Sequence, residues 1–187
     1  MKQPPSALIA IGAVLAAAVV GGSQGPQNPR NGIWYAALRK PPYTPPGPLI
    51  GAAWGVLDTL LCVSGTRLLN APRGPERSAA LTFWGLNVAG IAGYPWVFFG
   101  RRRLGASTAV VGAMLASAVG LVGTARMVDR TAAATSVPVA LWVGFAGVLS
   151  ADIWRRNRGL ESTRHDLKEA LASAENKDGN MTYLAMR

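Results

Sequence analysis

The strongest constraint on this chain is a series of long segments that contain no Asp, Glu, Lys or Arg. Each segment can supply the roughly 20 apolar residues that cross the hydrocarbon core of a bilayer. Only 15% of the 187 residues are charged, which excludes a soluble enzyme and a disordered chain. The charge-free segments are residues 3–29, 78–100, 104–125 and 131–151, and a further apolar run, 49–69, is interrupted by Asp58 and Arg67.

These runs predict an all-α, polytopic membrane protein in which residues 1–157 form a bundle of five transmembrane helices. Helices are expected because an isolated strand leaves its backbone groups unsatisfied in lipid, and the runs lack the alternation of barrel strands. The first run could instead be a signal peptide because Lys2 precedes it, although no clear A-x-A site follows. The predicted spans are residues 6–22, 49–69, 79–99, 104–127 and 133–154.

The formal net charge of +10 does not predict nucleic-acid binding, because most basic residues lie in the short segments between the apolar runs. Loops that face anionic lipid at a membrane surface have this pattern. Ten Lys and Arg residues follow the first, third and fifth spans, against six on the opposite side. The positive-inside rule therefore predicts a cytoplasmic first loop and a cytoplasmic C-terminus.

The remaining composition limits the chemistry of the chain. The single cysteine, Cys62, cannot form an intramolecular disulfide, and the single histidine, His165, lies beyond the last span. We therefore predict no metal site and no catalytic residue, and no nucleotide loop is present. Residues 158–187 are predicted to be a cytoplasmic tail, with a short surface helix followed by a disordered end.

The first loop, residues 24–48, contains the most informative motif, WYAALRKPPYTPPG at residues 34–47. Its four prolines fix backbone angles and cannot continue a helix, and its aromatic residues suit a membrane interface. On these properties alone, the motif describes either a stiff cap over the bundle or an ordinary aromatic belt.

The loop motif and the last span together resemble the TspO/MBR family of tryptophan-rich sensory proteins, which are related to the mitochondrial translocator protein. The family pattern W-Y-x-x-L-x-K-P-x-aromatic-x-P-P is met from Trp34 to Pro46. In the last span, Pro138 with Trp142 and the stretch from Trp154 to Asn157 also fit the family. The chain departs from its relatives at Asp58, where an aromatic residue is common. It also lacks the tyrosine of the cholesterol-recognition pattern, which makes a sterol ligand doubtful.

The resemblance implies a pocket between the helices, with the first loop as its lid. Helical spacing places Trp54, Asp58 and Cys62 on one face of the second span, and residues 87, 91, 94 and 98 on one face of the third. An ionisable group within a span, such as Asp58, is a functional-site hypothesis by default. The alternative is a protonated Asp58 that forms a hydrogen bond with Asn87 or a backbone carbonyl and contributes only to helix packing. The candidate ligand-binding residues are Trp34, Tyr35, Trp54, Asp58, Asn87, Tyr94, Trp142 and Ala146.

The resemblance further implies a tetrapyrrole ligand, porphyrin or haem, and a role in sensing, regulation or transport. Axial ligation of haem iron would need Tyr, Met or Cys62, so metal-free porphyrin is favoured, and no obligatory cofactor is expected. Enzymatic activity is not expected, apart from the light-driven porphyrin degradation proposed for some relatives. The alternatives are a transporter of another small apolar or amphipathic solute, and a regulatory or structural membrane subunit.

A ridge of small residues on the third span, Gly85, Ala89 and Gly93, predicts close approach of a second copy of the chain. It lies on the side of the helix away from Asn87, so one face can line the pocket while the other forms a homodimer. A rival ridge, Gly112, Ala116 and Gly120, lies on the fourth span.

Overall fold

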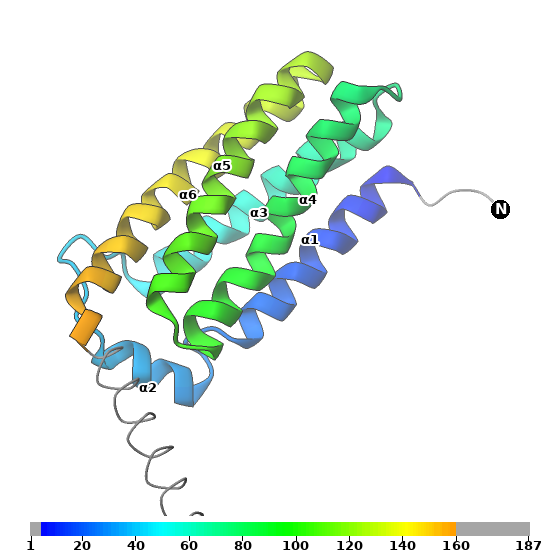
Figure 1. Ribbon diagram of the computed structural model, residues 1–187. Helices are drawn as coiled ribbons and strands as arrows, with labels where there is room; N and C mark the ends of the chain where they lie inside the picture. The colour runs from blue at the N-terminus through cyan, green and yellow to red at the C-terminus, as the bar shows by residue number, and fades with distance from the viewer. Residues whose placement is uncertain (1–4, 160–187) are drawn as a thin grey trace, which may run out of the picture.

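The computed structural model describes residues 5–159, and the predicted tail lies almost wholly outside them. The described part of the chain is helical, without strands, which confirms the predicted fold class. Five long helices lie side by side, and the short helix α2 crosses one end of the bundle (Figure 1). The elements are α1 (Ser6–Ser23), α2 (Pro29–Ala37), α3 (Gly47–Asn70), α4 (Pro75–Pro95), the π-helical segment η1 (Trp96–Gly100), α5 (Leu104–Val128) and α6 (Arg130–Arg156).

The five long helices form a closed ring in the order α1–α3–α6–α5–α4, and α4 returns to α1. Their ends lie within a few residues of the predicted spans. Four of them, α1, α3, α5 and α6, are long and apolar enough to cross a membrane by hydropathy. The fifth, α4, is more polar because it begins with Glu76 and Arg77 and contains Asn87.

The outer surface of the ring is apolar, as expected for a protein that faces lipid. Large aliphatic side chains such as Leu8, Val19 and Leu141 remain more than 60% exposed on the outside. The first helix is part of the bundle, because its residues Ala10 and Val14 are fully buried in the core shared with the other helices.

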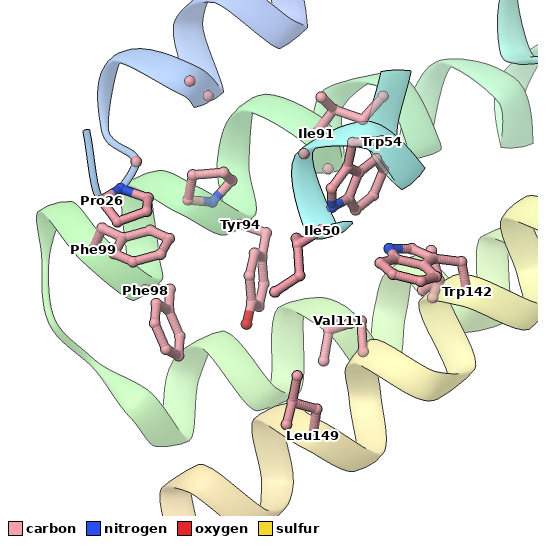
Figure 2. A pocket seen from close by; sticks show the side chains of 18 of the residues that line it. Pro26, Ile50, Trp54, Ile91, Tyr94, Phe98, Phe99, Val111, Trp142 and Leu149 are labelled. Carbon is pink, nitrogen blue, oxygen red and sulfur yellow. The ribbon is translucent and has the colours of Figure 1, made fainter. Parts of the chain in front are cut away.

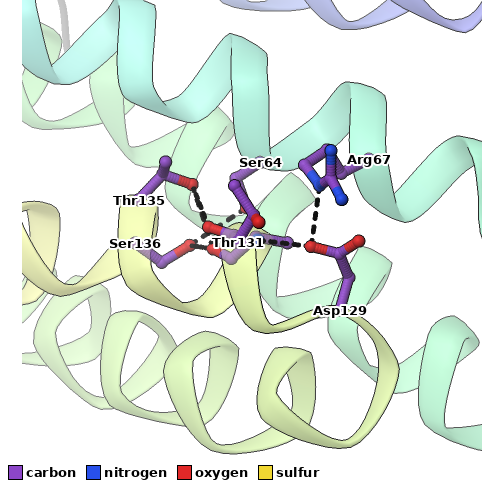
Figure 3. A network of polar contacts seen from close by, with 7 residues as sticks. Ser64, Arg67, Asp129, Thr131, Thr135 and Ser136 are labelled. Carbon is purple, nitrogen blue, oxygen red and sulfur yellow. Dashed lines mark hydrogen bonds and ion pairs between the residues drawn. The ribbon is translucent and has the colours of Figure 1, made fainter.

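Close helix contacts inside the ring depend on small residues and on paired polar groups. Gly90 of α4 lies against Met114 of α5. The hydroxyl groups of Ser64 on α3 and Ser136 on α6 lie 3.0 Å apart in the buried interior (Figure 3). Such contacts hold membrane helices together where no hydrophobic driving force acts between them.

The connections between successive long helices lie alternately at the two ends of the bundle (Figure 1). The lid helix α2, the turn between η1 and α5 and the end of α6 lie at one end (Figure 1). At the opposite end, Arg67 of α3 pairs with Asp129, which begins α6, at an N–O distance of 2.8 Å (Figure 3). Arg67 therefore pairs with a loop residue rather than with Asp58, in agreement with the helical spacing of the two.

Candidate functional site

A pocket of about 300 Å³ lies inside the ring, in the half of the bundle nearest α2. Its walls come from the five long helices, η1 and the first loop. Figure 2 shows the indoles of Trp54 and Trp142 at one end of the pocket, Phe98 and Phe99 at the other, and Tyr94 between them. The lining is mainly apolar and aromatic, which is typical of a small-molecule site.

The first loop contains the short helix α2, which sequence analysis did not predict and whose Tyr35 lines the pocket. Asn28 begins it by accepting a hydrogen bond from the Arg30 N–H, and Pro29 occupies its first turn. Lys40 ends it, because its ammonium group donates to the carbonyl oxygens of Tyr35, Ala36 and Leu38 at 2.7 to 3.3 Å. A lysine at a helix C-terminus satisfies carbonyl groups that have no partner in the helix.

Asn157 fixes the loop to the end of α6. Its side-chain oxygen accepts from the Arg39 N–H at 3.0 Å, and its amide nitrogen donates to the Arg39 carbonyl at 2.9 Å. A second attachment joins the Tyr43 hydroxyl to the Asp152 carboxylate at 3.1 Å, and Arg156 pairs with the same carboxylate. Asp152 therefore forms an ion pair within α6 and also fixes the loop. Burial and the adjacent Asp152 raise the pKa of Tyr43.

An aromatic cluster joins the lid to the pocket. Trp34 and Tyr35 of α2 make edge contacts with Phe98 and Phe99, with ring centroids 5.5 to 6.3 Å apart. The Arg101 N–H bonds to the Trp96 carbonyl five residues back, which defines the π turn. Both neighbouring phenylalanines of this turn contact α2. Burial raises the pKa of the Tyr35 phenol.

Asp58 is the one pocket residue with a carboxyl group. It lies one helical turn beyond Trp54 on α3, and its Oδ1 is buried with no hydrogen-bond partner. The alternative hydrogen bond between Asp58 and Asn87 is not formed, and the Asn87 amide donates instead to the Phe83 carbonyl and to the Ser117 hydroxyl.

The structure brings together six of the eight predicted ligand-binding residues and separates two. Trp34 does not line the pocket, because its ring packs against Phe98 and Phe99 within the lid contact. Asn87 does not line it either, because it lies deeper along α4, where that helix packs closely on α5. The residues that do line it are Tyr35, Trp54, Asp58, Tyr94, Trp142 and Ala146.

Several lining residues were not predicted as part of the site. They come from the end of α1, the start of the loop and α5, and Gly21, Pro26 and Met114 are examples. A side chain at Gly21 would collide with the Ile91 carbonyl, so glycine lets α1 approach α4 beside the pocket. No sequence pattern separates such small and aliphatic residues from ordinary packing. By contrast, Phe98 shares the predicted face of the third span.

Comparisons with known proteins agree with this architecture. The sequence profile of the TspO/MBR family matches residues 10–155, most of the chain. The chain belongs to the TspO/MBR family. It is 31% identical over 129 residues to "Protein CrtK" of Rhodobacter capsulatus, covering 68% of this chain and 81% of that protein. It is 32% identical over 137 residues to "Translocator protein" of Ovis aries, covering 70% of this chain and 79% of that protein. It is 29% identical over 132 residues to "Tryptophan-rich protein TspO" of Bacillus cereus, covering 69% of this chain and 84% of that protein.

The TspO/MBR loop motif has a structural explanation in this chain. Trp34 and Tyr35 supply the rings over η1, Leu38 is buried among them, and Lys40 ends α2. Asn157, from the last part of the family pattern, fixes the loop in place. Family membership and the apolar helices together identify a multi-pass membrane protein.

Proposed function

We propose that this TspO/MBR protein binds a planar tetrapyrrole, preferably a metal-free porphyrin, in the pocket beneath α2. The observation that carries the proposal is the aromatic lining, in which Trp54, Tyr94 and Trp142 surround the cavity. Aromatic rings stack favourably on flat conjugated ligands, and Trp and Tyr bring large apolar surfaces to such contacts.

The donor set favours a metal-free ring over tight coordination of haem iron. Of the residues considered as axial ligands, Tyr35, Tyr94 and Met114 line the pocket, and Cys62 does not. The Tyr94 hydroxyl lies 3.5 Å from the Ser150 hydroxyl, and Met114 packs tightly against Gly90. Haem binding would therefore depend mainly on stacking and burial of the ring.

The size of the pocket implies that the lid takes part in binding. A volume of about 300 Å³ lies at the lower end of the range for small-molecule sites. A tetrapyrrole ring would therefore need α2 to move outward before it closes again. This movement would couple occupancy of the pocket to the conformation of the first loop, which is a basis for sensing or regulation.

The test is a titration with metal-free porphyrin, followed by quenching of tryptophan fluorescence and by the porphyrin absorbance. We expect saturable binding that weakens about tenfold in Trp142→Ala. Trp96→Ala is the matched control, because Trp96 is 47% exposed and lies outside the pocket. Absence of saturable binding, or equal affinity in Trp142→Ala and the wild type, would refute the proposal.

Transport is a second candidate function, because several relatives are named translocator protein. Porphyrin flux across proteoliposomes distinguishes it from binding alone. Flux that requires the protein and stops when the lid is cross-linked to α6 would favour transport. Binding without flux would favour sensing or a regulatory subunit.

A further inference from the structure

The pocket contains a carboxyl group that no residue of the described chain neutralises. Oδ1 of Asp58 is buried without a hydrogen-bond partner, and none of the residues that line the pocket is Lys, Arg or His. The other two aspartates in residues 5–159 have arginine partners, namely Asp129 with Arg67 and Asp152 with Arg156. Asp58 is thus the exception among the described aspartates.

The position of Asp58 makes an unpaired carboxylate energetically unfavourable. It lies in the middle of α3, which spans Gly47–Asn70, far from both ends of the helix. An isolated carboxylate in a low-dielectric interior is strongly unfavourable, whereas one that is paired and hydrogen-bonded is tolerated. A ligand that brings a positive charge would give the carboxylate of Asp58 the partner that it lacks.

The walls beside Asp58 suit the same type of ligand. Trp54 precedes it by one helical turn on the same face of α3, and Trp142 of α6 also lines the pocket (Figure 2). Tryptophan is the side chain that binds cations best through its ring face, and aromatic walls are a common way to hold organic ammonium groups. Two indoles and one carboxylate therefore provide both stacking and charge neutralisation.

The charge distribution along the bundle would also orient such a ligand. The lid end carries the basic residues Arg30, Arg39 and Lys40 and the run from Arg101 to Arg103. The inner end of the pocket carries only the carboxyl group of Asp58. A positively charged nitrogen is favoured at the inner end, and acidic groups are favoured near the lid.

We propose that the Trp54–Asp58–Trp142 end of the pocket selects aromatic ligands that carry a protonated nitrogen. The inference rests on the proposed function only in that it uses the same pocket, and it concerns the charge that a ligand carries at the inner end of that pocket. It makes Asp58 a specificity-determining residue of this chain.

The experiment compares three probes that share one naphthalene ring and differ only in the end group. They are 2-(naphthyl)ethylamine, which is protonated at pH 7, 2-(naphthyl)ethanol, which is neutral, and naphthylacetate, which is anionic. We expect the wild type in detergent to bind the amine at least tenfold more tightly than the alcohol, and the alcohol more tightly than the acid.

Substitutions at Asp58 and Asp129 then test whether Asp58 causes the preference for the amine. Asp58→Asn keeps the shape of the side chain and should reduce the amine-to-alcohol ratio to within about twofold. Asp129→Asn is the matched control, because it removes a carboxylate at the opposite end of the bundle and should leave the ratio unchanged. Asp58→Glu should retain the preference and shows that the position tolerates replacement.

The outcomes separate this inference from the proposed function. Equal affinity for all three probes in the wild type, or a full preference in folded Asp58→Asn, overturns the inference even if porphyrin binds. A preference for the amine that is lost in Asp58→Asn supports the inference even if porphyrin does not bind. If neither porphyrin nor any probe binds, both proposals fail.

Discussion

Nε1 of Trp84 on α4 donates a hydrogen bond to the carbonyl oxygen of Leu61 on α3 at 2.9 Å, and its indole ring lies directly against Gly65. This hydrogen bond and the indole contact join α3 and α4 across the interior of the bundle. The absence of a side chain at residue 65 is what allows this approach, because an added Cβ would lie 2.6 Å from the indole.

We therefore expect Gly65→Ala to destabilise the protein by about 1 to 3 kcal/mol, the usual cost of overpacking a well-packed core. The measurement is the thermal unfolding midpoint in detergent. Gly55→Ala on the same helix is the control, because a Cβ there meets nothing within 4 Å. Alanine is the better helix former, so this control should be neutral or slightly stabilising. An equal effect of both substitutions would contradict the packing role of Gly65.

The attachment of the lid by Asn157 predicts a kinetic effect on the ligand. Asn157→Ala removes the two hydrogen bonds to Arg39, each of which contributes about 1 kcal/mol. We expect porphyrin to dissociate about tenfold faster, measured by stopped-flow displacement. Asn157→Asp keeps the acceptor for the Arg39 N–H but loses the donor, and it should give an intermediate rate. Unchanged dissociation in both variants would show that the lid opens elsewhere.

The contact between Arg67 and Asp129 predicts a pH dependence of stability. The hydrogen bond from Arg67 (Figure 3) lowers the pKa of Asp129, and the carboxylate also accepts from the Ala132 N–H at the start of α6. A carboxyl group with a lowered pKa stabilises the fold above its unfolded-state pKa of about 3.9. This stabilisation is lost as the pH falls through the lower value in the folded protein.

Two variants at Asp129 separate the charge from the helix cap. Asp129→Ala should lose about 1 kcal/mol at pH 7, because the cap is removed. Asp129→Asn keeps a capping side chain and should lose only a few tenths of a kcal/mol, the value of an exposed ion pair. Its thermal midpoint should also fall less than that of the wild type between pH 5 and pH 3. A parallel fall in both proteins would contradict the assignment.

The outer face of α4 predicts a homodimer. An added Cβ at Gly85 or Gly93 meets nothing within 4 Å, and Ala89 between them is exposed. In the rival ridge on α5, Gly120 already packs against Phe83 within the subunit. We expect Gly85→Leu with Gly93→Leu to be monomeric by light scattering in mild detergent, and Gly112→Leu to remain dimeric. A monomeric wild type would exclude this interface.

The distribution of basic residues predicts the orientation in the membrane. The lid end of the bundle carries most of them, and the positive-inside rule places this end in the cytoplasm. A reporter that is active only after export should be inactive when fused after Arg187. A fluorescent reporter that folds in the cytoplasm should be bright at the same position. Export-dependent activity would reverse the topology.

The fold was largely predictable because charge and proline mark where each helix leaves the membrane. The predicted second span, residues 49–69, differs by only a few residues from α3, Gly47–Asn70. The helix α2 escaped prediction because prolines surround it, although Asn28, Pro29 and Lys40 are recognisable helix-end signals.

The site was predictable only where side chains are distinctive. Tryptophan, tyrosine and aspartate in a span stand out, and Trp54, Asp58 and Trp142 do line the pocket. Helical spacing predicts which residues share a face of α4, but not how far along α4 the pocket extends. Asn87 was therefore assigned to the pocket, although it contacts Ser117 of α5 outside the pocket lining. The end of α1 lines the pocket because the helix packing places it beside α4, and no local sequence pattern predicts that packing.

The order of the helices in the ring has a consequence for biosynthesis. The neighbour of α3 on one side is α6, which leaves the ribosome last among the long helices, so the ring cannot close until α6 has entered the bilayer. Trp142 and the attachment of the loop by Asn157 arrive with it. Until that moment the nascent chain holds Asp58 in the membrane without the wall of the pocket that α6 supplies. A chain truncated before α6 would expose that carboxyl group to lipid and become a target for membrane quality control.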